Sequence, residues 1–168
     1  MKRTFLVFAL ITSVVLSYAQ NKPVLSPPAT AKQTLANGVE VTINYAQPSV
    51  KGRTIGNDIA PYGKVWRTGA NAATQFEVNK DVTVNGHALK AGKYSLFTIP
   101  GVKEWVVIFN KTWDQWGAYK YQEKEDALRV NVKSGKTKQF TEQMTFEIDK
   151  AGQVDLLWGD VAVGFKVK

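Results

Sequence analysis

Hydrophobic and polar residues alternate over short stretches along most of the chain. Between residues 39 and 45, valine, isoleucine and tyrosine alternate with glutamate, threonine and asparagine. This period of two is typical of a β-strand that buries one face. No stretch shows a convincing helical period. Further strands are predicted at residues 76–78, 82–84, 92–99, 105–109, 128–132, 145–148, 154–158 and 161–167.

Tight turns separate several of these stretches. Asn37-Gly38 and Asn85-Gly86 favour β-hairpins, because asparagine and glycine tolerate the positive φ angles of the commonest two-residue turns. Pro100-Gly101 lies between two predicted strands and indicates a third hairpin. Residues 149–152 and Gly159-Asp160 are predicted to connect the last strands.

Eight or nine short strands joined by tight turns predict an all-β fold. Each strand has one apolar face. Two packed sheets or a barrel would bury these faces, whereas an open sheet would leave them exposed. We predict a single domain at residues 29–168, a two-sheet antiparallel β-sandwich with jelly-roll character.

The first residues have the layout of a secretory signal peptide. Lys2 and Arg3 precede an apolar run at residues 5–16, and small residues follow at Ser17 and Ala19. The run is shorter than the roughly 20 residues that a membrane-spanning helix needs. We expect a signal peptide at residues 1–19, with an uncleaved anchor as the alternative, and then a proline-rich extended leader at residues 20–28. The mature protein is then exported, periplasmic or secreted, without a transmembrane segment.

Composition narrows the functional classes. The chain has no cysteine, which excludes disulfides, thiolate catalysis and cysteine-bound metals. Loss of Lys2 and Arg3 with the signal peptide leaves 20 of the 22 basic residues against 14 acidic ones, a net charge of +6. These charges are spread along the chain rather than clustered, which argues against nucleic-acid binding.

Few residues support catalysis or metal binding. His87 is the only histidine, and it follows a hairpin turn, where an exposed side chain is expected. No run of alternating acidic and amide residues resembles a calcium loop, so we predict neither a metal nor a cofactor. A carboxylate pair for glycoside hydrolysis needs no fixed spacing. The candidates are Asp58, Glu104 and Asp114, each in or beside an irregular segment.

Residues 46–73, the first loop, form a long segment without a strand pattern. Long loops in compact domains are either functional or cap the core. This loop combines cations suited to a carboxylate or phosphate with aromatic rings and an asparagine. Its candidate ligand-binding residues are Lys51, Arg53, Tyr62, Trp66, Arg67 and Asn71. Alternatively, Arg67 and Asn71 satisfy the backbone of the loop while Trp66 plugs the end of the core.

Residues 111–126, the second loop, are rich in aromatic residues. Flat rings beside amide and carboxylate groups are typical of a carbohydrate-binding surface. The candidate ligand-binding residues of this loop are Trp113, Trp116 and Tyr119. Alternatively, the aromatic residues fold back over the hydrophobic core as a lid.

Four strings in the mature chain are distinctive. They are Pro48-Ser49-Val50-Lys51-Gly52-Arg53, Pro61-Tyr62-Gly63-Lys64-Val65-Trp66-Arg67-Thr68-Gly69-Ala70-Asn71, Ala91-Gly92-Lys93-Tyr94-Ser95-Leu96-Phe97-Thr98-Ile99-Pro100 and Trp116-Gly117-Ala118-Tyr119. They closely resemble the bacterial domain of unknown function 2911 family, from about Ser26 to the C-terminus. The resemblance implies a secreted or periplasmic protein of the Bacteroidetes type and no established activity. The family often has glutamate where this chain has Ala72, which weakens an enzymatic interpretation centred there.

Three functional hypotheses follow from the sequence. The leading one is a non-catalytic envelope module that binds a small polar, anionic or glycan ligand through the two loops. One alternative is a hydrolase that acts on a polysaccharide or cell-wall polymer. The other is a structural or partner-binding domain.

Overall fold

The computed structural model describes residues 25–168. The predicted signal peptide, residues 1–19, lies outside the described residues, as do residues 20–24 of the predicted leader. The first strand begins at Pro28, the last residue of that leader. Within residues 25–168, no helix is long and apolar enough to cross a membrane.

Nine strands and one short 3₁₀ helix make up the regular structure of the described residues. The strands are β1 (Pro28–Thr34), β2 (Glu40–Ala46), β3 (Thr74–Val78), β4 (Val82–Val84), β5 (His87–Leu89), β6 (Gly92–Ile99), β7 (Glu104–Asn110), β8 (Asp126–Ile148) and β9 (Gln153–Lys166), and the 3₁₀ helix is η1 (Glu123–Glu125). Seven strands form one antiparallel sheet in the order β1-β2-β3-β6-β7-β8-β9, while β4 and β5 form a separate two-stranded sheet.

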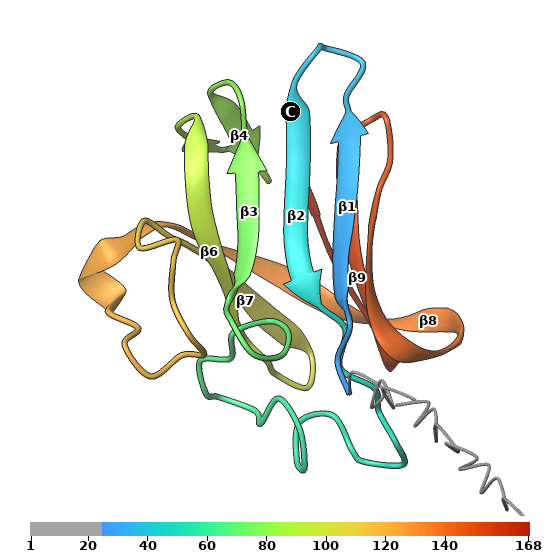
Figure 1. Ribbon diagram of the computed structural model, residues 1–168. Coiled ribbons are helices and arrows are strands. Elements are labelled where there is room, and N and C mark those ends of the chain that lie inside the picture. Colours follow the sequence, from blue (N-terminus) through green and yellow to red (C-terminus); the bar gives the residue numbers. More distant parts are fainter. Residues whose placement is uncertain (1–24) are drawn as a thin grey trace, which may run out of the picture.

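The all-β class is confirmed, but the two-sheet sandwich with jelly-roll character is not. A single seven-stranded sheet curls on itself instead, with the small β4–β5 sheet beside it (Figure 1). The long strand β8 crosses the molecule, so that residues 126–133 pair with β7 and residues 134–148 pair with β9. The curl lets one sheet bury its own inner face, because strands from both ends contribute to one hydrophobic core.

Contacts between distant parts of the sequence close the curl. Two backbone hydrogen bonds of 2.9 and 3.0 Å and an antiparallel bridge join residues 48–50 to residues 142–144 of β8. Nearby, the Tyr45 hydroxyl accepts a 3.1 Å hydrogen bond from the backbone N–H of Phe146, 101 positions away. We call this junction the seam. It keeps the first and last strands around a common core.

The last four predicted strands are parts of two longer ones. Residues 128–132 and 145–148 both belong to β8, and residues 154–158 and most of 161–167 belong to β9. The predicted connection at Gly159-Asp160 was wrong, because it lies inside β9. Gly159 has a φ of 59°, and the pairing with β8 shifts register near it. This glycine interrupts the regular pairing without ending the strand.

The predicted hairpin at Asn85-Gly86 is confirmed. The turn joins β4 to β5, and its two residues have φ angles of 49° and 87°. Positive values at both positions match the tight turn that this dipeptide favours. His87 follows the turn and is exposed, as expected.

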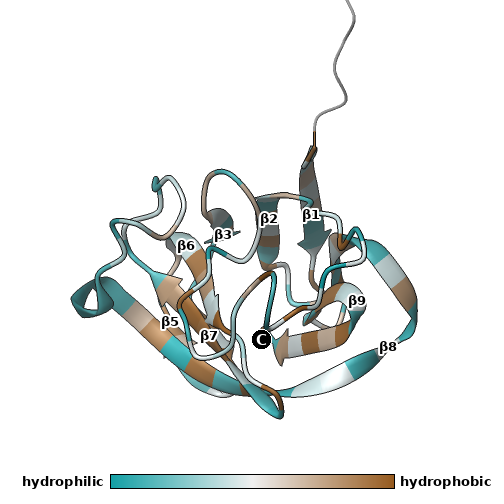
Figure 2. Ribbon diagram, turned by 90° about the horizontal axis from the view of Figure 1, so that it is seen from below, coloured by the Kyte–Doolittle hydropathy of each residue, from teal (hydrophilic) through white to brown (hydrophobic). Residues whose placement is uncertain are grey.

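Aromatic side chains fill the interior of the curl. Phe76 of β3 and Phe109 of β7 meet edge-on with ring centroids 4.9 Å apart, and Phe165 of β9 meets Phe109 at 5.6 Å. Along β9, brown hydrophobic bands are separated by paler ones (Figure 2), and buried residues alternate with less buried ones over most of the strand. Each strand therefore sends one face into this core and leaves its other face outside the curl.

Candidate functional site

A row of polar residues crosses the outer face of the sheet. Residues paired across neighbouring antiparallel strands point to the same face, so the register shows which side chains lie side by side. On β2 and β3, Ile43 and Phe76 are fully buried on the inner face, so the residues next to them in each strand, Asn44 and Gln75, point to the outer face. The outer residues, which we call the polar row, are Thr30, Asn44, Gln75, Ser95, Asn110 and Asp126, on β1, β2, β3, β6, β7 and β8.

The second loop covers one half of the polar row. Ser95 Oγ donates a hydrogen bond to the carbonyl of Thr112 at 2.9 Å. Asn110 Nδ2 donates to the carbonyl of Gln122 at 3.0 Å, while Asn110 Oδ1 accepts from Gln115 Nε2 at 3.1 Å. Ser95 and Asn110 are therefore completely buried, although both lie on the outer face. The second loop therefore covers this part of the sheet, but the predicted aromatic lid was wrong for most of its residues: Tyr121 packs on Phe97, whereas Trp113, Trp116 and Tyr119 are exposed.

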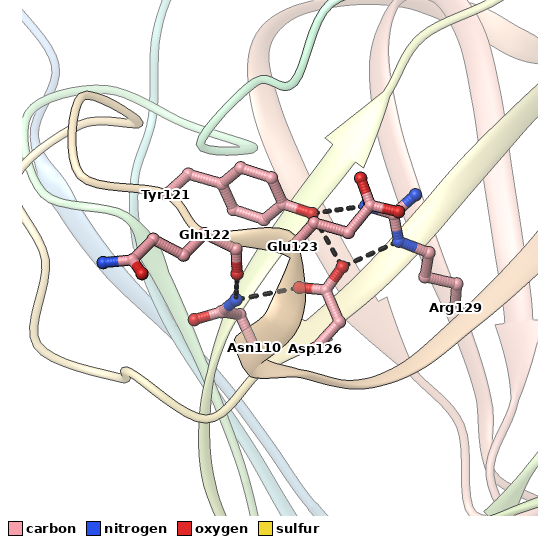
Figure 3. Close-up of polar contacts among 6 residues, drawn as sticks. All are labelled: Asn110, Tyr121, Gln122, Glu123, Asp126 and Arg129. Carbon is pink, nitrogen blue, oxygen red and sulfur yellow. Dashed lines mark hydrogen bonds and ion pairs between the residues drawn. The ribbon is translucent and has the colours of Figure 1, made fainter.

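An ion-pair network fixes the end of the second loop to the sheet (Figure 3). The Tyr121 hydroxyl donates to Asp126 Oδ2 at 2.7 Å and accepts from Arg129 Nη2. Arg129 also pairs with Asp126 through Nε at 2.7 Å and with Glu123 through Nη2 at 3.2 Å. The other Asp126 oxygen accepts from Asn110 at 2.8 Å. Because the Asp126 side chain is only 7% exposed, these contacts hold the loop firmly.

The Tyr121 network predicts a loss of stability at high pH. Burial, with the hydrogen bond to Asp126, raises the pKa of Tyr121 from 10.0 to about 12. The folded-state pKa is the higher one, so the stabilising effect is complete below about pH 10 and is lost as the pH rises through about 12. We expect the free energy of unfolding to fall more steeply in this range for the wild type than for Tyr121→Phe. Urea denaturation of both proteins measures this difference, and parallel pH curves would contradict it.

The two loops meet beside the uncovered half of the polar row. Residues 71–73 of the first loop join residues 115–117 of the second through an antiparallel bridge and two backbone hydrogen bonds of 2.9 and 3.1 Å. A hollow of about 330 Å³, which we call the groove, lies next to this junction. Asn71 and Trp116 line it together with Asn44 and Gln75 of the polar row. The structure thus brings together one predicted site residue from each loop.

The groove combines an exposed indole ring with free amide groups. Trp116 is 68% exposed. The side chains of Asn71 and Gln75 form no hydrogen bond with another described residue, and Asn44 uses only its oxygen, which accepts from Thr30 Oγ1 at 2.7 Å. No side chain in the lining carries a charge. The groove therefore offers an apolar surface and several donors and acceptors to a neutral polar ligand.

Trp66 and Arg67, also predicted as site residues, do not line the groove. Trp66 is 9% exposed and stacks on Trp158 with ring centroids 5.2 Å apart and planes 10° apart. This is the core position that the alternative interpretation of the first loop expects. Arg67 is partly buried, and its Nε atom has no hydrogen-bond partner among residues 25–168.

The remaining predicted residues of the first loop lie elsewhere. Arg53 and Tyr62 line a second and larger hollow, the cleft, between the first loop and the middle of β8. The backbone N–H of Lys51 donates to Glu142 Oε1 at 2.8 Å, beside the seam. The first loop therefore contributes to two separate hollows.

Trp113 and Tyr119 of the second loop are exposed but do not line the groove. The Lys93 ammonium group lies 4.8 Å from the centroid of the Trp113 ring, which is a cation–π contact. The Tyr119 ring covers Gly117, where it would block any added Cβ atom. Of the three aromatic residues predicted to bind a ligand in this loop, the structure places only Trp116 in the groove.

The predicted catalytic carboxylates make local contacts. Asp58 Oδ2 accepts from the backbone N–H of Thr54 at 2.8 Å, and Glu104 accepts from Asn131 at 2.9 Å, while Asp114 is exposed in the second loop. Neither the groove nor the cleft has two carboxylates in its lining. In the part of the chain that the structure describes, no group of three metal-ligating side chains could hold a metal ion.

A protein-family model matches most of the chain. It is described as a protein of unknown function, DUF2911, and it matches residues 26–167. The chain belongs to the DUF2911 family. No curated protein and no solved structure matched it.

In this DUF2911 chain, position 72 lies in the groove. Ala72 is part of the lining and forms the bridge with Trp116. A glutamate here would bring a carboxylate to the groove, whereas alanine keeps the lining neutral.

The sequence does not single out Asn44 or Gln75 as site residues. Each occupies a polar position in an alternating strand, as many solvent-facing residues do. The register of β2 and β3, which pairs the two residues directly, is the signal that identifies them.

Proposed function

We propose that this protein is an exported, non-catalytic module that binds a neutral glycan in the groove. The observation that carries this proposal is the exposed ring of Trp116 beside amide groups with unused hydrogen-bonding capacity. Export is proposed from the signal-like pattern of residues 1–19. The protein then meets its ligand in the periplasm or outside the cell.

The chemistry of the lining favours a sugar. A sugar ring has an apolar face that stacks on an aromatic ring, and its hydroxyl groups both donate and accept hydrogen bonds. Asn44, Asn71 and Gln75 provide amides that do the same. An anionic ligand, which the sequence also suggests, would find no cation in the groove. The neutral lining therefore favours the glycan.

The size of the groove favours a small ligand. Its volume of about 330 Å³ is at the lower end of the roughly 300–1,000 Å³ typical of small-molecule sites. We infer that the groove holds a monosaccharide or the end of a longer chain.

A glycan array followed by calorimetry tests this function. The purified protein should retain at least one neutral glycan, and Trp116→Ala and Gln75→Ala should each weaken that binding about tenfold or more, because each removes a direct contact. Trp113→Ala is the matched control, since it removes an exposed tryptophan of the same loop that does not line the groove. This control should bind like the wild type. An array without any binding, or equal binding by Trp116→Ala, would overturn the proposal.

A further inference from the structure

The cleft is a second hollow with a different chemical character. Its volume is about 600 Å³, and it shares no lining residue with the groove. The first loop forms one wall, and β8 and β9 form the other near Lys136 and Asp160. An inference about the cleft is therefore independent of the glycan proposal.

The cleft lies where the curled sheet is incompletely paired. The pairing of β8 with β7 ends at Lys133, and β8 meets residues 48–50 only at residues 142–144. Gly135, Lys136 and Phe140, which lie between these two junctions, line the cleft. The cleft is thus a gap between the place at which β8 pairs with β7 and the place at which it pairs with residues 48–50.

Exposed apolar side chains gather around the cleft. Tyr62 is 42% exposed, Val102 is 72% exposed and Phe140 is 64% exposed, although such side chains are usually buried. All three line the cleft, and they come from three separate parts of the chain. Their convergence forms an apolar surface suited to the body of an organic ligand.

A fixed cation lies in the same lining. Arg53 Nε donates to the carbonyl of Val50 at 3.1 Å, and Nη2 donates to the carbonyl of Ser49 at 2.6 Å. These bonds orient the guanidinium group without neutralising it, and Nη1 forms no hydrogen bond with any residue between 25 and 168. Within residues 25–168, neither Arg53 nor Lys136 forms an ion pair. With Asp160 as the one acidic residue of the lining, two cations and one anion give the cleft a net charge of +1.

We propose that the cleft binds an organic carboxylate with an apolar body. The carboxylate group pairs with the oriented guanidinium of Arg53 and with the ammonium of Lys136. The apolar body packs against Tyr62 and Phe140. Asp160 opposes the bound charge and limits the affinity.

Displacement of a fluorescent anion tests the chemical class. Anilinonaphthalene sulfonate, an aromatic anion that fluoresces in apolar surroundings, is titrated into the full-length protein. One equivalent should bind, and phenylbutyrate should displace it at a concentration about tenfold or more below that needed for the neutral phenylbutanol. Inorganic phosphate, which lacks an apolar body, should not displace it. Equal displacement by acid and alcohol would overturn the proposal.

Two substitutions with opposite expected effects locate the site. Arg53→Gln should weaken phenylbutyrate binding about tenfold, because it removes the oriented cation. Asp160→Asn should tighten binding about threefold, because it removes a like charge from the same cleft. If Arg53→Gln weakened binding only because it loosened the first loop, no tighter binding by Asp160→Asn would be expected. Unchanged phenylbutyrate affinity in Asp160→Asn would overturn the assignment to this cleft.

A third substitution separates the cleft from the groove. Trp116→Ala should bind phenylbutyrate like the wild type, whatever its effect on glycans, because Trp116 does not line the cleft. Weaker phenylbutyrate binding by this variant would place the anion in the groove and overturn the proposal. Failure of the glycan proposal alone would leave these results unchanged.

Discussion

Replacement of Trp66 by alanine is expected to lower the free energy of unfolding by about 3–5 kcal/mol. The Trp66 ring is buried, stacks on Trp158 and meets Trp105 edge-on with centroids 6.3 Å apart. Its loss leaves a cavity between two other large rings, and the surrounding curl cannot collapse to fill it without disturbing the core. Urea denaturation followed by circular dichroism measures the change in stability.

Trp116→Ala is the matched control for this prediction. Both tryptophans lie in long loops, but Trp116 is largely exposed, so its loss should change the free energy of unfolding by about 0.5 kcal/mol or less. Similar losses of stability in the two variants would contradict the assignment of Trp66 to the core and Trp116 to the surface.

Gly152→Ala should lower the free energy of unfolding by about 3–4 kcal/mol. Gly152 has a φ of 88°, which is unfavourable for alanine, and an added Cβ atom would lie 2.0 Å from the carbonyl oxygen of Val167. The backbone N–H of Val167 donates to the Gly152 carbonyl at 2.8 Å, and Val167 itself forms a bridge with Val84. A displaced Val167 would therefore also weaken the pairing of β4 with the C-terminal end of the chain. Thermal and urea unfolding of the variant measure this loss.

Gly86→Ala separates backbone strain from steric conflict. Gly86 has a φ of 87°, almost the same as Gly152, but its added Cβ atom would meet nothing within 4 Å. Only the strain of the turn applies, so we expect a loss of about 1 kcal/mol. If both alanine variants lost the same stability, the contact with Val167 would not be the cause.

The local elements of the fold could be predicted from the sequence, whereas the arrangement of the sheet could not. A period of two identifies strands such as β2 because burial of one face acts on every second residue. The prediction divides β9 because Gly159 looks like a turn residue when its partners are unknown. It divides β8 because residues 133–143 contain almost no apolar residues that could show a period of two. The seam has no local signal, since it joins residues about a hundred positions apart. The extent of the long strands and the seam both depend on which strands pair, and no short stretch of sequence determines that pairing.

The same distinction applies to the candidate site. Asn71 and Trp116 stand out in loops of unusual composition, and the structure places both in the groove. Trp66 looks equivalent to Trp116 in the sequence, because both lie in irregular segments and only packing distinguishes them. Asn44 and Gln75 belong to the site because the register of β2 and β3 pairs these two outward-facing residues directly.

We expect the seam to form late in folding. Most neighbours in the seven-stranded sheet are also neighbours in the chain, so the sheet can grow by the addition of one hairpin after another. Closure must wait for residues 142–144 to reach residues 48–50, and bringing such distant segments together is slow because of the chain entropy that is lost. Until the C-terminal strands arrive, the inner face of the early hairpins remains exposed and prone to aggregation.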